Sequence, residues 1–311
     1  MRTVLVVGSS NTDMIIRVAR VPRPGETVLG GEFSMASGGK GANQAVAAAR
    51  AGGRVRLVAR VGDDVFGERA VRGFEAHGID VRFVARDGRA PSGVALINVA
   101  ADGENIISVA SGANALLAPE DVLGAEPAFD GADVVLLQLE TPLETVRAAA
   151  VMASERGIPV ILNPAPARPL DDRLLGRVAV LTPNETETEI LTGIRVETSE
   201  GAPKAAAALR ARGPRLVVVT LGEKGCYAAG EDFEGSVPAF PVRAVDTTAA
   251  GDVFNGALAV ALAEKRPTRD ALRFASAAAA LSVMSPGAQP SAPARTRIEE
   301  FLREGPPASG R

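Results

Sequence analysis

The sequence predicts an α/β fold in which a central, mostly parallel β-sheet lies between two layers of helices and carries a small β-sheet lid. Two observations predict this three-layer sandwich. Short apolar runs alternate with amphipathic stretches, which is typical of βαβ units and of a sheet covered on both faces. Two further segments alternate without a helical rhythm, which indicates a separate small sheet.

The predicted strands of the central sheet are apolar runs rich in β-branched residues, at 3–7, 56–61, 133–139, 160–162, 178–181 and 216–220. The predicted helices between them lie at 41–51, 67–76, 143–156, 186–191 and 203–212. Ligands of such sheets bind beyond the carboxyl ends of the strands. Polar residues follow several of these strands, so we expect the functional site at that edge.

Segments 13–37 and 93–110 are predicted to form the small sheet as antiparallel strands, the second with a turn at Asp102-Gly103. A sheet standing off an α/β core is typical of a lid over a binding cleft, and an extension of the main sheet at its edge is the alternative. We therefore expect one α/β domain over 1–311, with a lid from 13–37 and 93–110 and a disordered tail at 303–311.

Composition argues against several classes of protein. The net charge is −3 and no basic cluster stands out, which argues against a nucleic-acid partner. The single cysteine, Cys226, rules out a disulfide framework and suits a reducing compartment. The chain begins on a strand-like run rather than a signal peptide, and no apolar stretch approaches the roughly 18 residues of a membrane span. We expect a cytoplasmic protein without a membrane or nucleic-acid partner.

Three segments near predicted strand ends could contact a ligand, and the paired polar groups of the first suit a polyol. GSSNTD (8–13) places Asn11 and Asp13 two residues apart, so both face the same way on an extended segment, unless they form a turn. In SGGKGAN (37–43), glycines around Lys40 allow a ligand or a hinge close to the backbone. This is not a P-loop, because Gly41 rather than Ser or Thr follows Lys40. In QLETP (138–142), Glu140 leaves a carboxylate at the end of an apolar strand.

Two further strand ends carry groups that could bind a metal ion or a ligand. Asn184 and Glu187 lie three apart at a helix start, which indicates either a cap with a first-turn acid or a site for hydrated Mg²⁺. In VVVTLGEKG (217–225), the glycines let a flat ring or a phosphate lie against the backbone, and a tight hairpin turn is the alternative.

The segment AVDTTAAGDVFNGAL (244–258) carries the clearest chemical signal. Ala249, Ala250 and Gly251 expose backbone N–H groups at the start of a helix that begins near Asp252, which is typical of an anion site. Asp252 cannot bind the anion itself, because the two charges repel. We interpret it as a base for the group that attacks a phosphate, and a first-turn acid that caps the helix is the alternative.

Taken together, GSSNTD, GGKGANQAVAAAR, LNPAPA, LTPNETE, TLGEKG, VDTTAAGD and GAQPS occur in an order and spacing that resembles the ribokinase/PfkB family of carbohydrate kinases. The resemblance covers the chain from Val4 to about Leu302. It implies the ribokinase-like fold and ATP-dependent phosphorylation of D-ribose at its 5-hydroxyl. The general family signature has glycine where this chain has Ala249, and alanine at that position is common in the ribokinase branch.

The resemblance also implies a role for each candidate residue. The sugar would bind to Asn11, Asp13, Gly39, Lys40, Gly41, Ala42, Asn43, Glu140 and Asp252. ATP would lie against Asn184, Thr220, Leu221, Gly222, Glu223, Lys224, Gly225, Gly251 and Ser276. Glu187 would help to order hydrated Mg²⁺. Asp252 would be the general base, and the N–H groups of Ala249, Ala250 and Gly251 would stabilise the transferring phosphoryl group.

Asp246 has no part in this chemistry, and an unpaired carboxylate at the mouth of the anion site would repel ATP. The resemblance implies a K⁺ site here, formed mostly by backbone oxygens of Asp246, Thr248, Ser282, Ser285, Gly287 and Ser291. The alternative is that Asp246 caps a turn or the following helix. The resemblance further implies a homodimer in which the lid sheets pack together.

Other functions stay open at this point. The chain could phosphorylate deoxyribose, fructose or a nucleoside, and Asn11 and Asp13 are where that choice would be made. It could be a non-catalytic sugar-binding regulator, which we would expect to have lost Asp252. A dinucleotide-dependent oxidoreductase is disfavoured because the glycine fingerprint is missing after the first strand.

Overall fold

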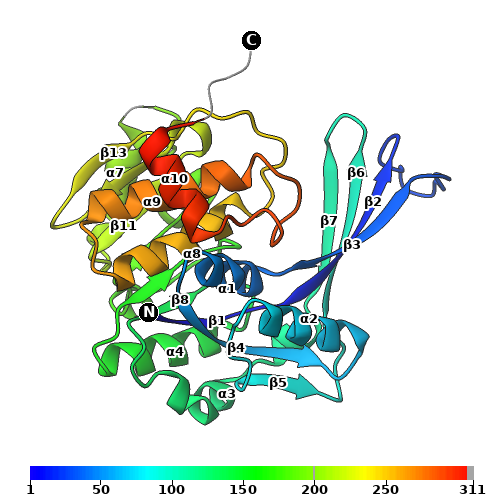
Figure 1. The fold of residues 1–311 in the computed structure, drawn as a ribbon, viewed down its shortest axis with the longest axis horizontal. Coiled ribbons are helices and arrows are strands. Elements are labelled where there is room, and N and C mark those ends of the chain that lie inside the picture. The colour runs from blue at the N-terminus through cyan, green and yellow to red at the C-terminus, as the bar shows by residue number, and fades with distance from the viewer. Residues whose placement is uncertain (199, 307–311) are drawn as a thin grey trace.

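The computed structural model describes residues 1–198 and 200–306. Within these residues, nine strands form one sheet in the order β13-β12-β11-β10-β9-β8-β1-β4-β5 (Figure 1). Neighbouring strands from β11 to β5 run parallel, and β12 and β13 are antiparallel. The strands are β1 (Thr3–Val7), β4 (Arg54–Gly62), β5 (Val84–Asp87), β8 (Val134–Leu137), β9 (Val160–Leu162), β10 (Val180–Leu181), β11 (Leu216–Thr220), β12 (Cys226–Ala229) and β13 (Glu234–Val237). The predicted mostly parallel sheet is confirmed.

Helices cover both faces of this sheet, as predicted for a three-layer sandwich. One layer consists of α1 (Lys40–Arg50), α2 (Val65–Ala76), α8 (Ala250–Ala263), α9 (Thr268–Ser282) and α10 (Arg295–Glu304). The other consists of α3 (Pro119–Gly124), α4 (Leu143–Glu155), α5 (Asp172–Leu175), α6 (Glu185–Thr192) and α7 (Gly201–Arg210). Short 3-10 helices lie in the connections, at η1 (Gly112–Leu116), η2 (Glu126–Ala128) and η3 (Gly222–Lys224).

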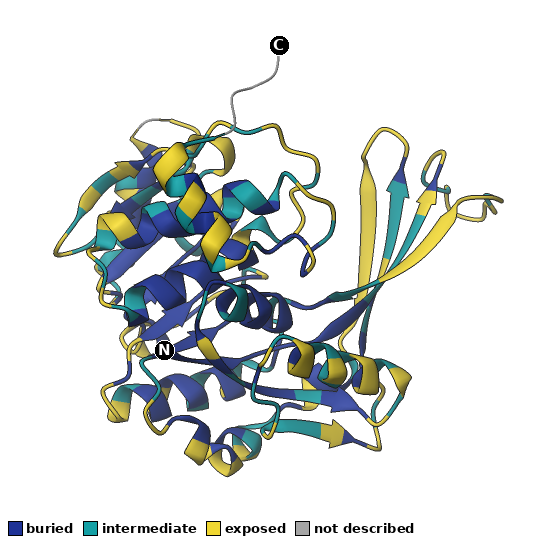
Figure 2. Ribbon diagram, viewed as in Figure 1, coloured by how far each residue is buried: buried dark blue, intermediate teal, exposed yellow. Residues whose placement is uncertain are grey.

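Burial explains why the central strands could be located from the sequence. Every residue of β1 and β8 is buried, because helices cover both sides of these strands, and such strands are apolar throughout. Helix α8 is buried along most of its length (Figure 2). It packs closely on α1, since a Cβ at Gly256 would lie 2.6 Å from the carbonyl oxygen of Gln44. This contact brings the start of α8 next to the start of α1.

A second sheet of four strands stands off the main body (Figure 1), with the order β3-β2-β6-β7. Its strands are β2 (Asn11–Val18), β3 (Glu32–Gly38), β6 (Gly93–Ala100) and β7 (Asn105–Ala110). It is a separate sheet, as predicted, and not an extension of the central one. It is not purely antiparallel, however, because β2 and β6 pair in parallel. A hairpin forces antiparallel pairing only on strands that are joined by a short turn, such as β6 and β7.

Several elements differ from the sequence analysis. The strands β5, β12 and β13 and the helices α3, α5, α9 and α10 were not among the predicted elements. The strands and α3 and α5 are brief, whereas α9 and α10 are full-length helices that the sequence analysis did not identify. Helix α10 reaches Glu304, so it includes the first two residues of the tail expected to be disordered at 303–311. Residues 307–311 lie outside the described residues. None of the described helices combines the length and the apolar character needed to cross a membrane.

Candidate active site

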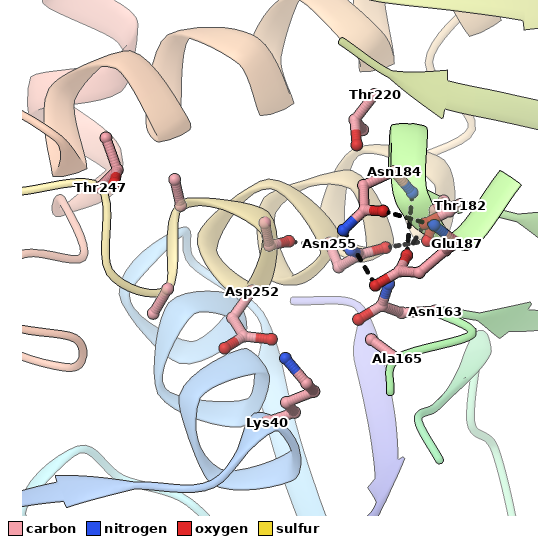
Figure 3. Close-up of a pocket in the computed structure, with 13 residues that line it drawn as sticks. Lys40, Asn163, Ala165, Thr182, Asn184, Glu187, Thr220, Thr247, Asp252 and Asn255 are labelled. Carbon is pink, nitrogen blue, oxygen red and sulfur yellow. Dashed lines mark hydrogen bonds between the residues drawn. The ribbon is translucent and has the colours of Figure 1, made fainter. Parts of the chain in front are cut away.

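A pocket of about 200 Å³ opens at the carboxyl ends of the parallel strands, where such sheets bind ligands. Asn163 follows β9, Thr182 follows β10 and Thr220 ends β11. The lining residues are Lys40, Asn163, Ala165, Thr182, Asn184, Glu187, Thr220, Thr247, Ala249, Ala250, Gly251, Asp252 and Asn255 (Figure 3). The predicted edge of the sheet therefore holds a polar pocket that also contains the start of α8.

Asp252 lies in the first turn of α8 and is only 6% exposed. Its Oδ1 accepts a hydrogen bond from Gln44 Nε2 at 2.9 Å, and its Oδ2 accepts one from Asn43 Nδ2 at 3.0 Å. The Lys40 ammonium points toward the carboxylate (Figure 3). Burial raises the pKa of Asp252, although the charge of Lys40 and the two amide donors oppose this effect. The site thus holds a carboxylate with a raised affinity for a proton, which suits a general base.

The start of α8 supplies backbone donors beside this carboxylate. Ala249 caps the helix in the left-handed conformation, with φ of 60°, and no side chain caps it. The N–H of Ala250 donates to the carbonyl of Thr247 at 3.2 Å. Within residues 1–198 and 200–306, the N–H groups of Ala249 and Gly251 have no protein acceptor. Two unpaired N–H groups at the positive end of a helix make an anion site.

Three other charged side chains lie on the α1 side of Asp252. Glu140 accepts hydrogen bonds from Ser9 Oγ at 2.6 Å and from the N–H of Lys40 at 2.9 Å. Burial raises the pKa of Asp13 to about 6, and the charges of Glu140 and Asp252 add to this effect. Burial lowers the pKa of Lys40, but the surrounding carboxylates outweigh it and raise that pKa overall. The candidate sugar ligands Asp13 and Glu140 are therefore gathered around the candidate base.

The other candidate sugar ligands are Asn11 and the residues at the start of α1, and their contacts differ. The side-chain oxygen of Asn11 accepts from Asn114 Nδ2 at 2.8 Å. Gly39 precedes α1 with φ of 86°, and Gly41 is buried against the backbone of Ser9. The side chain of Ala42 packs in the core, and its N–H donates to the carbonyl of Ser9. Ala42 therefore has neither a polar side chain nor a free N–H with which to bind a sugar.

Asn184 and Glu187 form a capping box at the start of α6. The N–H and the side-chain amide of Asn184 donate to the two carboxylate oxygens of Glu187, and the N–H of Glu187 donates to Asn184 Oδ1. The helix-cap interpretation of this pair is thus realised. Burial also raises the pKa of Glu187. Over the described part of the chain, no group of three or more His, Cys, Asp or Glu side chains could hold a metal ion.

The segment 220–225 forms the tight turn between β11 and β12, which was the alternative to a nucleotide loop. Thr220 lines the pocket. Its neighbours in the turn do not, and neither does the buried Ser276 on α9. These neighbours are Leu221, Gly222, Glu223, Lys224 and Gly225.

Asp246 joins two loops near the pocket. Its Oδ1 accepts from the N–H of Thr248 at 2.9 Å, and its Oδ2 accepts from the N–H of Gly287 at 2.8 Å. The N–H groups of Val245 and Asp246 donate to the carbonyl of Val283. The structure therefore brings the loop before α8 against the segment 283–287. The hydroxyls of Ser282 and Ser291 donate to carbonyls three residues earlier.

Sequence reasoning missed several residues of the site. Asn163 and Thr182 were given no role, although each is a polar residue that follows an apolar strand at the predicted binding edge. Asn255 is a polar residue inside the buried helix α8, where it accepts from Thr182 Oγ1 at 2.6 Å and donates to the carbonyl of Gly251 at 2.8 Å. Gln44, which contacts Asp252, lies in an apolar stretch of α1 and gave no such signal.

The comparison with known proteins agrees with this geometry. Residues 1–295 match the family model described as pfkB family carbohydrate kinase. The chain belongs to this family. It is 44% identical to a ribokinase of Haemophilus influenzae, an alignment that covers 97% of this chain and 98% of the relative. It is also 41% identical to a deoxyribokinase of Salmonella typhi, over 96% of this chain and 98% of the relative. The structure of Arabidopsis thaliana ribokinase complexed with ribose and ATP matches with a TM-score of 0.90 at 35% identity, over 97% of this chain and 99% of that one. The resemblance stated from the sequence is confirmed.

Proposed function

We propose that this protein is an ATP-dependent ribokinase, which transfers a phosphoryl group to the 5-hydroxyl of D-ribose. One observation carries the proposal. A buried carboxylate, Asp252, lies beside unpaired N–H groups at the start of α8. A hydroxyl held there has a base to accept its proton and an anion site to receive the phosphoryl group. Relatives named ribokinase, matched along nearly their whole length, support the same conclusion.

In this proposal the start of α8 holds the transferring phosphoryl group. Bound as its Mg²⁺ complex, ATP supplies that group. The N–H groups of Ala249 and Gly251 stabilise negative charge on it, while Lys40 provides the nearest positive side chain. Asn184 and Thr220 line the pocket and would border the nucleotide. Because phosphoryl transfer depends mainly on positioning and electrostatics, the chain needs no covalent nucleophile.

The sugar would lie on the α1 side of Asp252. There Asn11, Asp13 and Glu140 offer one amide and two carboxylates to neighbouring hydroxyls, under a lid formed by the small sheet. This arrangement would direct the 5-hydroxyl toward Asp252, which accepts its proton as the phosphoryl group is transferred. Asn43 is already bonded to Asp252, but its amide nitrogen has a second hydrogen that a sugar oxygen can accept.

Different residues would bind the two proposed ions, Mg²⁺ and K⁺. Mg²⁺ keeps several waters and needs few protein carboxylates, which suits a pocket where Glu187 is the acid nearest Asn184. Each oxygen of Glu187 already accepts from Asn184 but retains a further lone pair. For K⁺, the carboxylate of Asp246 and the carbonyls of the loop 282–291 are oxygen ligands of the required kind. The site residues would be Asp246, Thr248, Ser282, Ser285, Gly287 and Ser291.

We propose two further properties of the molecule. The chain would act as a homodimer through its small sheets, because one face of that sheet carries exposed apolar side chains such as Phe33 and Ile106. It would work in the cytoplasm, where its single thiol, Cys226, stays reduced. Burial raises the pKa of that thiol to about 12, which suits a structural and unreactive role.

A kinase for deoxyribose is the second candidate, since the deoxyribokinase relative is almost as similar as the ribokinases. A coupled assay of ADP release with ribose, 2-deoxyribose, fructose and adenosine decides between them. The proposal predicts the highest kcat/KM with ribose. A higher value with 2-deoxyribose would reassign the substrate, and no ADP release with any acceptor would favour a non-catalytic sugar-binding protein.

A further inference from the structure

The three glutamines of this chain, Gln44, Gln138 and Gln289, all belong to one network around Asp252. Gln138 Nε2 donates to Gln44 Oε1 at 2.6 Å, and Gln44 Nε2 donates in turn to Asp252 Oδ1. On the other side, Gln289 Nε2 donates to Asn43 Oδ1 at 3.2 Å, and Asn43 Nδ2 donates to Asp252 Oδ2. Each oxygen of the carboxylate is therefore held by an amide that is itself held by a glutamine.

The carboxylate fixes the direction of the Gln44 arm. An ionised carboxylate only accepts hydrogen bonds, so Gln44 must turn its nitrogen toward Asp252. Its oxygen then faces Gln138, which must present its own nitrogen. The second hydrogen of Gln44 Nε2 goes to Asn163 Oδ1 at 3.0 Å, and Asn163 Nδ2 donates to the carbonyl of Thr182 at 3.1 Å. The donors of Gln138 and Gln44 thus lead to Asp252, and the second hydrogen of Gln44 leads through Asn163 to the carbonyl of Thr182.

Gln138 anchors this arm at a cost. Its side chain is buried, and Oε1 has no hydrogen-bond partner within the described residues. Gly8 makes room for it, because a Cβ there would lie 2.1 Å from Gln138 Oε1. A buried acceptor without a partner destabilises the fold. Its retention is understandable if the nitrogen of the same amide has a function, and that nitrogen holds Gln44.

We propose that Gln44 is a positioning residue, which orients the carboxylate of Asp252 and stabilises its ionised form while Gln138 holds Gln44 from behind. Gln44 is fully buried and does not line the pocket, so it acts on the reaction only through Asp252. The inference rests on the proposed role of Asp252 as the base. It explains how a carboxylate can stay ionised in a buried site that favours the protonated acid.

The groups around Asp252 shift its pKa in opposite directions. Burial and the charge of Glu140 raise the pKa of Asp252, and Lys40, Asn43 and Gln44 lower it. Removal of the Gln44 donor should therefore raise the pKa further. The titratable groups that face Asp252 are Lys40, Glu140, Asp13 and Glu187.

The test replaces Gln44 by methionine, which has a similar size and no amide. In protein labelled at the aspartate carboxyl carbons, the NMR signal of Asp252 is identified by its absence in Asp252→Asn. We expect its titration midpoint to rise by about one pH unit in Gln44→Met, since a hydrogen bond to a charged group has about this strength. The acid limb of the kcat profile for ribose should move upward with it. At acid pH, the kcat of Gln44→Met should be about tenfold lower than that of the unmodified protein. At higher pH the two kcat values should agree, and the KM for ribose should stay within about twofold throughout.

Thr145→Val is the matched control, because it also removes a buried hydrogen bond, from Thr145 Oγ1 to the carbonyl of Leu117 on the far side of the sheet. It should lower stability and leave both the midpoint and the acid limb unchanged. If Gln44→Met does not fold, the double variant Gln44→Met/Gln138→Met removes the unpaired partner as well and carries the same test.

An unchanged midpoint for Asp252 in the folded variant would overturn the proposal, as would a loss of kcat that is equal at every pH. The NMR midpoint needs no turnover. Absence of ribose phosphorylation by the unmodified protein would therefore refute the proposed function alone, while the midpoint still decides the role of Gln44.

Discussion

At the scale of single residues, Asp13 is a carboxyl group whose ionised form the folded protein disfavours. Its folded-state pKa of about 6 lies above the ordinary value of 3.8, because burial and the charges of Glu140 and Asp252 disfavour ionisation. Ionised Asp13 therefore lowers stability. The loss is fully present above about pH 6 and disappears as the pH falls from about 6 toward 4. Strain of this kind is typical of binding residues.

We expect Asp13→Asn to be more stable than the unmodified protein near neutral pH and to bind ribose more weakly. A pKa displaced from 3.8 to about 6 sets an upper limit of roughly 3 kcal/mol, and partial exposure reduces the gain to about 1–2 kcal/mol. Urea unfolding measures it. The difference between the two proteins should shrink as the pH approaches 4. An equal difference at both pH values would contradict the assigned cause.

Ala249 has a strained backbone conformation, because its φ of 60° is unfavourable for a residue with a side chain but not for glycine. The family signature has glycine here. We expect Ala249→Gly to keep kcat within about twofold and to change stability by less than about 1 kcal/mol, since relief of strain opposes the greater freedom of the unfolded chain.

The control is Ala250→Gly, at the first helical position of α8. Glycine has no strain to relieve there, so this variant should lose about 0.5–1 kcal/mol. If thermal unfolding showed the two variants to be equally destabilised, the strain at Ala249 would have no energetic weight.

At the scale of elements, the sequence predicted strands most accurately where helices cover both faces of the sheet. The strands β1, β9 and β11 begin and end at the predicted residues, since continuous apolar runs have clear ends. The parallel pairing of β2 with β6 could not be predicted, because it joins segments about eighty residues apart that no local pattern links. The same limit applies to the site. Asp252 was recognised from its own segment, whereas its partner Gln44 is 208 residues away and lies in an apolar helix.

The two loops joined by Asp246 give a prediction at this scale. If K⁺ binds there and orders the start of α8, activity in K⁺ should exceed activity in Na⁺ or Tris at equal ionic strength. Asp246→Ala should abolish that difference. Asp246→Asn keeps one oxygen as an acceptor for the backbone N–H groups but loses the charge. It should therefore preserve more of the stability while also losing the response to K⁺. Equal rates of the unmodified protein in all three buffers would refute the proposed K⁺ site.

At the scale of the whole molecule, one face of the small sheet carries two neighbouring rows of mostly apolar side chains, and we propose that a second copy covers it. The strand register places Met35, Met14, Leu96 and Ser108 in one row of side chains, and Phe33, Ile16, Asn98 and Ile106 in the next row on the same face. Phe33 is 63% exposed. Contiguous exposed apolar surface of this kind marks an interaction site.

We expect sedimentation to show a dimer, and Ile106→Glu to convert it to a monomer. Ile107→Glu is the matched control, because this neighbour on β7 is similarly exposed but points to the opposite face. A dimer that survives Ile106→Glu would place the interface elsewhere, and a monomer at all working concentrations would refute the dimer.

Asp252 lines the pocket and lies close to Asp13 and Glu140, so one substitution tests the proposed transfer between a nucleotide on one side and a sugar on the other. The measurement compares kcat and the Kd for ribose in the unmodified protein and in Asp252→Asn. The new amide sets a donor against Asn43 or Gln44, so a modest loss of stability is expected. The account predicts that kcat falls by about 10²–10⁴-fold, while the Kd for ribose stays within a few-fold. A variant that keeps more than half of the original kcat would show that Asp252 is not the base.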